Sequence, residues 1–252
     1  MGRPLISVMV VAHGAERTLG FALASVSSQT MADWECIVVD DGSTVPTSGL
    51  VESLRDERFR SVRLNENGGR GNARLRGLEV ARGELLAFLD ADDWMYPERL
   101  ETELACLRRE NASLVGASMV VEDAAHRVLG IQGVAVRGPV GLGRFPFSFA
   151  PVLVEMQLAR AVGFDPRLTR SEDVLFLTRA LERPWASISR PLYAYRPSSP
   201  SRASVLEGYR CSRAAYAQSR AGNPIAALRL ELSFSLRALV HRFAPAALSE
   251  RV

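Results

Sequence analysis

The sequence predicts an α/β protein with a mostly parallel central sheet flanked by helices. Three β-rich apolar runs, 5–12, 34–39 and 85–89, are separated by segments with the spacing of amphipathic helices. Strands and helices that alternate in this way form βαβ units. The run 85–89 is apolar at every position, which indicates a strand buried on both faces of a parallel sheet.

The first half of the chain alternates predicted strands and helices throughout. The expected strands cover 5–12, 34–39, 59–64 and 85–89. The expected helices, where apolar residues recur at intervals of three or four, cover 15–29, 51–56 and 71–81. Because parallel strands end at the same edge of a sheet, the strand ends at Ala12, Asp40 and Asp90 should lie along one edge.

The second half of the chain is less regular. Its expected elements are a helix after Pro97, strands over 113–121 and 187–195, and a helix that starts at 171–173. Residues 124–143 contain several glycines and alternating valines, which indicates a hairpin with a mobile loop. Residues 146–162 indicate a strand or a helix, and the pattern does not decide between them.

The last part of the chain is predicted to be helical only. It forms an extension over 205–252, following a main domain over 1–204. One apolar stripe of its last helix contains Ile225, Leu228, Leu232, Leu236, Leu239 and Phe243. This stripe is expected to pack on the main domain; the alternatives are a homodimer contact or a peripheral contact with a membrane surface.

The composition limits the classes of function. The net charge of +3 arises from 31 basic and 28 acidic residues. Because the two signs nearly balance, the charge does not indicate nucleic-acid binding. The basic residues are all arginine, which excludes lysine-based chemistry. The three widely spaced cysteines fit neither a zinc site nor a disulfide framework, so we expect buried thiols in a reducing compartment.

The chain shows no sign of a membrane-spanning segment. No apolar stretch reaches the roughly 18 residues that a transmembrane helix needs, and the N-terminus leads directly into a strand pattern. We therefore expect a cytoplasmic protein, with peripheral contact at the inner face of the membrane as a variant of that expectation.

Three carboxylates follow the strand 85–89 within four positions, in Asp90-Ala91-Asp92-Asp93. Acids this close repel one another unless a cation or hydrogen-bond donors compensate. Oxygen ligands suit Mg²⁺ or Mn²⁺, and Mg²⁺ is commonly shared with substrate phosphates. A polar turn is the alternative, but the position after a buried strand favours a cation site.

Two further segments lie at predicted strand ends. Asp40-Asp41 precedes Gly42-Ser43, and Asn67 to Gly71 is rich in glycine. Either segment alone is typical of a turn. Together with Asp90-Ala91-Asp92-Asp93, in this order and at this spacing, the two segments form a distinctive pattern.

These motifs together strongly resemble the family 2 glycosyltransferases with the GT-A fold, a Rossmann-like α/β fold. The resemblance covers roughly residues 5–204. The matching stretches are 6–8, 25–30, 38–44, 67–68, 73–74, 81–84, 88–93, Pro97, 163–165, 172–173 and 195–196. It implies a donor half at about 1–110 and an acceptor half at about 111–204.

The resemblance implies a hexosyltransferase-like enzyme that moves one sugar from a nucleotide-diphospho-sugar, most often UDP-linked, with inversion. Asp41 would accept a hydrogen bond from the nucleobase, and Asp40 would support its loop. The other residues expected to contact the donor are Ala12, Glu16, Arg70, Arg74, Asp90 and Asp92. Pairing with a neighbouring acid is an equal alternative for Arg70 and Arg74.

The resemblance also implies roles in catalysis. Asp92 and Asp93 would hold Mn²⁺ or Mg²⁺, which neutralises charge on the departing diphosphate. Asp173 would be the general base that takes the proton of the acceptor hydroxyl. Glu172 beside it is expected to be structural or to contact the acceptor.

The sequence departs from the family pattern at three places. His13-Gly14 follows the first strand instead of Tyr-Asn, Leu75 follows Ala73-Arg74 instead of Asn, and no histidine follows Tyr195-Arg196. His13 could replace the aromatic residue near the base or cap the strand. These departures leave the donor sugar and base open.

Two other functions are compatible with the same residues. The first is a catalytically inactive homologue that binds nucleotide-sugars, and the second is a nucleotidyltransferase. A nucleotidyltransferase would normally have a basic glycine-rich loop after its first strand, which Val11 to Gly14 does not provide. The acceptor, whether a glycan, a lipid-linked sugar, a protein or a natural product, is not indicated by any motif.

Overall fold

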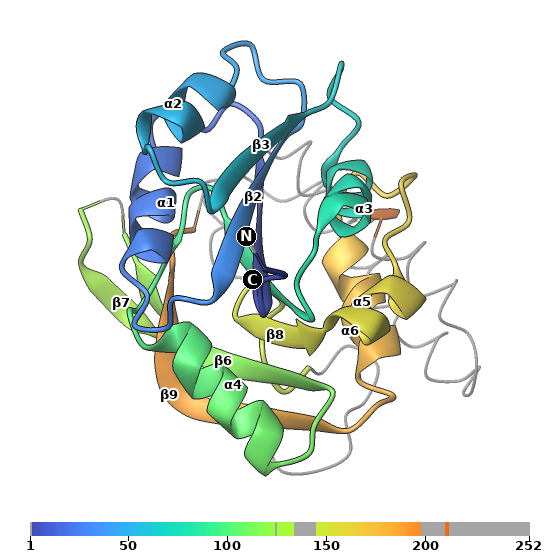
Figure 1. Cartoon of the computed structure of the whole chain (residues 1–252). Coiled ribbons are helices and arrows are strands. Elements are labelled where there is room, and N and C mark those ends of the chain that lie inside the picture. The colour runs from blue at the N-terminus through green and yellow to red at the C-terminus, as the bar shows by residue number, and fades with distance from the viewer. Residues whose placement is uncertain (1, 124, 134–144, 198–209, 212–252) are drawn as a thin grey trace, which may run out of the picture.

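The computed structural model describes residues 2–123, 125–133, 145–197 and 210–211. Within this part of the chain, helices cover both faces of a nine-stranded sheet (Figure 1). The strand order is β3-β2-β1-β4-β8-β6-β9-β5, and β7 pairs with β6 outside this path. The predicted α/β class with its mostly parallel sheet is confirmed, whereas the predicted extension over 205–252 lies outside the described residues apart from 210–211.

The strands are β1 (Ile6–Ala12), β2 (Trp34–Asp40), β3 (Phe59–Arg63), β4 (Leu85–Asp90), β5 (Trp94–Met95), β6 (Leu114–Glu122), β7 (Val128–Gln132), β8 (Val152–Glu155) and β9 (Trp185–Tyr195). The helices are α1 (Leu19–Ser27), α2 (Ser48–Ser53), α3 (Arg70–Val80), α4 (Arg99–Arg109), α5 (Met156–Val162) and α6 (Glu172–Ala180).

The first four long strands form the parallel half of the sheet. β1 pairs in parallel with β2 and β4, and β2 pairs in parallel with β3. The apolar residues of β4 are buried on both faces, as the uniform run 85–89 predicted. One core packs α1, α2 and α4 on one face, and the other packs α3, α5 and α6 on the opposite face (Figure 1).

The second half of the chain completes the sheet with mixed pairings. Residues 146–162, which indicated either a strand or a helix, contain both, because β8 leads directly into α5. β7 pairs antiparallel with β6, so the hairpin here uses the preceding strand 114–122 and only its second strand lies within 124–143, where the whole hairpin was expected. The loop expected after it, at 134–144, lies outside the described residues.

Two expectations from composition can be compared with the structure. All three cysteines are buried and free, as predicted. In the part of the chain that the structure describes, no helix has the length and apolar character needed to span a membrane.

Candidate active site

A cavity of about 720 Å³ opens where β1, β2 and β4 end. The register of the sheet brings these ends together, since Ala12 pairs with Asp40 and Val11 pairs with Asp90. The lining residues are Val11, 13–18, Asp41, 67–70, Arg74, 90–92, Thr169 and Arg170. The predicted gathering of strand ends at one edge is therefore present, and we call this space the edge cavity.

Ala12 and Asp40, both expected to contact the donor, lie beneath the edge cavity and do not line it. The Asp40 carboxylate accepts hydrogen bonds from the backbone N–H groups of Ser43 and Thr47 and from the Arg63 guanidinium, at 2.7 to 3.0 Å. Burial alone would raise the pKa of Asp40, but these hydrogen bonds outweigh it and hold the pKa below its usual value. Asp40 thus shapes the loop that follows β2.

Asp41 holds the glycine-rich loop in place. Its two carboxylate oxygens accept the backbone N–H groups of Gly68 at 2.9 Å and Gly69 at 3.0 Å. The residue is only 3% exposed, although it lines the edge cavity. A contact with a nucleobase would therefore use the lone pairs that these two hydrogen bonds leave free.

Gly42 allows the two loops to approach. Its φ is +67°, and a Cβ at this position would lie 2.6 Å from the backbone nitrogen of Asn67 and from the carbonyl carbon of Glu66. Both the conformation and the space therefore require glycine.

His13 joins the end of β1 to both loops. Its Nδ1 lies 2.8 Å from the carbonyl oxygen of Asp41, and its Nε2 lies 3.1 Å from the side-chain amide of Asn67. A carbonyl oxygen can only accept, so Nδ1 carries the proton and Nε2 accepts from Asn67. His13 is exposed and lines the edge cavity, so it both fixes the loops and forms part of the wall.

The three acids after β4 have different surroundings. Asp92 is exposed and lines the edge cavity, while Asp90 is partly buried there. Asp93 is 2% exposed, and its oxygens accept hydrogen bonds from the Tyr193 hydroxyl and the Arg196 backbone N–H, both at 2.8 Å. Burial and the nearby Asp90 raise the pKa of Asp93 to about 8.

Asp93 was expected to bind metal together with Asp92. The structure instead builds it into the fold, because both of its oxygens have protein donors and the residue does not line the edge cavity. The Tyr193 hydroxyl also accepts the backbone N–H of Asp90 at 3.0 Å. One tyrosine on β9 therefore fixes both ends of the acidic segment.

The two arginines on α3 also differ. Arg74 is buried and pairs with Glu172 and, at 3.3 Å, with Asp90, which is the ion-pairing alternative stated for it. Arg70 is exposed, lines the edge cavity and makes no ion pair among the described residues. An exposed guanidinium beside Asp92 is suited to a phosphate group.

Asp173 does not line the edge cavity. It lies in the first turn of α6 and lines a separate cavity of about 340 Å³. The polar side chains Gln132 and Ser148 line the same space, which we call the α6 cavity. Glu172 beside Asp173 pairs with Arg74, a wall residue of the edge cavity, so this ion pair connects the start of α6 to that cavity.

The residues at the edge can be tested against the expected divalent cation. Asp92 and Asp90 offer carboxylate oxygens, which are the ligands that Mg²⁺ and Mn²⁺ prefer. Among the described residues, no three His, Cys, Asp or Glu side chains are grouped so that they could hold a metal by themselves. The donor set fits a cation held by one or two carboxylates and completed by phosphate oxygens.

Sequence reasoning missed the contribution of β9 to this site. Tyr193 was not singled out, although it fixes the acids from 100 positions away along the chain. A tyrosine within the buried end of a strand is the available signal, since a buried hydroxyl needs a hydrogen-bond partner. Thr169 and Arg170, which also line the edge cavity, carried no signal in the sequence.

Comparison with solved structures identifies the fold. The chain matches the structure of residues 1–349 of S. aureus TarS in complex with UDP-GlcNAc, with a TM-score of 0.74 and 22% sequence identity. The match covers 98% of this chain and 76% of that one. The complex of the same TarS fragment with UDP gives a TM-score of 0.71. The chain therefore has the GT-A fold, in agreement with its parallel half-sheet and with the acids at the edge of that sheet.

Comparison of sequences finds relatives for the first half of the chain. The family described as glycosyl transferase family 2 matches residues 7–129. ExoO, a succinoglycan biosynthesis protein of Rhizobium meliloti, is 32% identical over 154 residues, or 60% of this chain. WfgD of Escherichia coli, a UDP-Glc:alpha-D-GlcNAc-diphosphoundecaprenol beta-1,3-glucosyltransferase, is 32% identical over 111 residues, or 44% of this chain. Residues 7–129 of the chain are thus similar to the family 2 glycosyltransferases.

The sequence matches do not extend over whole relatives. They cover 42% of ExoO and 44% of WfgD, so the chain spans less than half the length of either protein by alignment.

Proposed function

We propose that this protein transfers a single sugar from a UDP-linked donor to an acceptor hydroxyl, with inversion at the anomeric carbon. The observation that carries the proposal is the edge cavity, which combines the glycine-rich loop held by Asp41 with the exposed side chains of Arg70 and Asp92. The complexes of TarS with UDP-GlcNAc and UDP, and the UDP-glucose named for WfgD, support a uridine nucleotide as the donor.

Different residues of the edge cavity would contact different parts of the donor. His13 and the loop of Asp41 would contact the nucleobase, and Arg70 would contact the diphosphate. Asp92, with Asp90 in support, would hold Mn²⁺ or Mg²⁺. When bound, this cation offsets the charge that develops on the departing diphosphate. Glu16, exposed on the wall of the cavity, remains a further donor contact.

Inversion requires a base on the face of the sugar opposite the leaving group. Asp173 would take the proton of the acceptor hydroxyl while its oxygen bonds to the anomeric carbon and the bond to the diphosphate oxygen breaks. Support comes from the preceding residue Glu172, whose carboxylate pairs with Arg74 on the wall of the edge cavity and so ties the helix of Asp173 to that cavity. The lipid-linked sugar in the name of WfgD makes a lipid-diphosphate-linked sugar the first acceptor class to test.

The test is nucleotide release from a panel of nucleotide-sugars with Mn²⁺, together with UDP binding measured by calorimetry. We expect turnover with a UDP-sugar, and we expect Asp173→Asn to lose it while UDP affinity is retained. Glu182→Gln, which changes an acid just after α6, is the matched control and should behave as wild type.

Two outcomes would contradict the proposal. UDP binding without turnover of any donor would favour the inactive binding homologue. Full turnover by Asp173→Asn would remove Asp173 from the role of base.

A further inference from the structure

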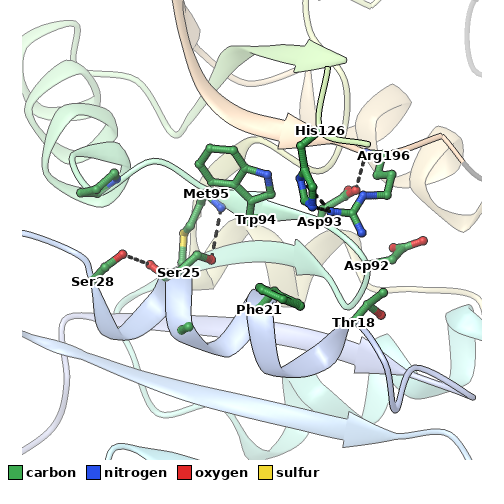
Figure 2. Close-up of a pocket in the computed structure, with 12 residues that line it drawn as sticks. Thr18, Phe21, Ser25, Ser28, Asp92, Asp93, Trp94, Met95, His126 and Arg196 are labelled. Atoms are coloured by element: carbon green, nitrogen blue, oxygen red, sulfur yellow. Dashed lines mark hydrogen bonds between the residues drawn. The ribbon is translucent and has the colours of Figure 1, made fainter. Parts of the chain in front are cut away.

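A second cavity, of about 340 Å³, adjoins the edge cavity between α1 and β5. It is lined by Thr18, Phe21, Ala24, Ser25, Ser28, 92–95, Pro97, His126 and Arg196 (Figure 2). Thr18 and Asp92 line both cavities, so the two spaces meet at Asp92. We call this second space the α1 cavity; none of the roles proposed above uses it.

One end of the α1 cavity is apolar. Phe21 rises from α1 on one side and Trp94 lies on the other, with Met95 and Ser25 behind them (Figure 2). Phe21 is 68% exposed, the most of any large apolar residue in the described part of the chain. Covering such a ring removes apolar surface from water, which is favourable, so this wall favours an apolar ligand.

The other end of the α1 cavity carries one guanidinium, that of Arg196, beside the carboxylates of Asp92 and Asp93. Figure 2 shows Arg196 and His126 together beside Asp92 and Asp93. The Arg196 Nη2 lies 3.3 Å from both ring nitrogens of His126, and no carboxylate within the described residues pairs with its guanidinium. Its Nε is buried without a hydrogen-bond partner in that same part of the structure. An unpaired guanidinium is suited to phosphate oxygens.

We propose that the α1 cavity binds the lipid portion of a lipid-phosphate acceptor. The isoprenoid or alkyl chain would lie between Phe21 and Trp94, and the phosphate would lie at Arg196. The α1 cavity meets the edge cavity at Asp92, so a sugar attached to the phosphate would lie next to the donor. The inference therefore rests on the proposed function, in which the edge cavity binds the donor. Charge complementarity and the apolar wall together select an amphiphile with an anionic head over a free sugar or a nucleotide.

The inference is tested by direct binding, without turnover. Farnesyl diphosphate, below its aggregation limit, is titrated calorimetrically into the full chain with and without saturating UDP and Mn²⁺. We expect binding that UDP does not displace. Phe21→Ser should weaken it about tenfold or more, because a serine cannot cover the isoprenoid chain. Arg196→Gln should weaken it to a similar degree.

The chain offers matched controls for both variants. Val45→Ser changes another exposed apolar residue outside the cavity, and Arg190→Gln changes an arginine of β9 that pairs with Glu98. Both should bind farnesyl diphosphate as wild type does. Phe21 does not line the edge cavity, so Phe21→Ser should keep its UDP affinity, which also shows that the variant is folded.

Three outcomes would overturn the inference. Displacement by UDP would place the probe in the edge cavity. If wild type and Phe21→Ser bound farnesyl diphosphate equally well, Phe21 would not contact the lipid chain. If farnesol bound as tightly as farnesyl diphosphate and Arg196→Gln had no effect, Arg196 would not contact the phosphate. Failure of UDP to bind, with farnesyl diphosphate still bound through Phe21, would instead overturn the proposed donor and leave the lipid site supported.

Discussion

The guanidinium of Arg74 on α3 pairs with the carboxylate of Glu172 on α6, 98 positions later in the chain. The same guanidinium reaches Asp90 and lies over the ring of Phe149, 4.4 Å from its centroid. Burial raises the pKa of Glu172, and Arg74 opposes this effect. The pair joins the acidic end of β4 to the helix that carries Asp173.

Replacing Arg74 should destabilise the fold strongly. Arg74→Met leaves the Glu172 carboxylate buried without its partner, which costs about 3–5 kcal/mol. Urea unfolding measures the loss, and adding Glu172→Gln to the same chain should recover part of it. Arg76→Met, on the same helix but paired with Glu79 at the surface, should cost less than about 1 kcal/mol. Equal losses in the two single variants would contradict this prediction.

Gly42→Ala should disturb the loops of the edge cavity. The added Cβ meets backbone atoms of Glu66 and Asn67, and φ is unfavourable for alanine. We expect a loss of about 1–3 kcal/mol in the free energy of unfolding and weaker UDP binding, both measured on the purified variant. Gly49→Ala in α2, where a Cβ meets nothing within 4 Å, should leave UDP affinity unchanged. An unchanged UDP affinity for Gly42→Ala would show that these loops do not hold the nucleotide.

Asp92 and Asp93 should respond differently to removal of their charge. Under the proposed function, Asp92→Asn should lower the Mn²⁺-dependent part of the UDP affinity about tenfold or more, because it removes the negative charge of an exposed oxygen ligand. Asp93→Asn keeps an oxygen for the Arg196 N–H and should keep the dependence on Mn²⁺. Titrations of UDP with Mn²⁺ and with a chelator compare them. The reverse ranking would assign the metal to Asp93.

Stability should depend on pH through Glu103. This carboxylate and Arg99 are fully buried, and burial raises the pKa of Glu103 to about 7, although Arg99 opposes the shift. A raised folded-state pKa contributes stability that is present below pH 4.5 and is lost as the pH rises through 7. The wild-type free energy of unfolding should fall by on the order of 1–3 kcal/mol over this range relative to Glu103→Gln.

The readout for Glu103 is the difference between the two pH curves. Glu103→Gln changes the absolute stability as well, because Arg99 loses its charged partner while its hydrogen bonds to the carbonyl oxygens of Phe88, Ala150 and Val152 remain. A difference that grows in favour of wild type as the pH rises would show that the folded-state pKa lies below 4.5.

The parallel half of the fold was readable because its signals are local. β1, β2 and β4 are apolar apart from Ser7, Glu35 and the closing acids Asp40 and Asp90, and burial on both faces leaves little alternation to confuse the pattern. The prediction for residues 146–162 stayed undecided for the opposite reason. β8 and α5 have four and seven residues and follow each other without a break, so neither period is sustained long enough to be recognised.

The sequence predicted which types of residue form the candidate site, but not which role each residue has there. Spacing indicates that Asp40, Asp41, Asp92 and Asp93 lie near one another, but it does not indicate which carboxylates the backbone itself occupies. That depends on contacts such as Asp41 with Gly68 and Asp93 with Tyr193, which join distant parts of the chain. The α1 cavity had no motif, since Phe21 looks like any apolar residue of a helix.

The anchoring of Asp93 by Tyr193 and Arg196 has a consequence for synthesis in the cell. These partners lie 100 and 103 positions after the acid. A nascent chain can pair β1, β2 and β4 while β9 is still within the ribosome, but its acidic segment then lacks the donors that fix it. The acidic segment is therefore fixed in its final position only after β9 and Arg196 have emerged, late in the synthesis of the chain.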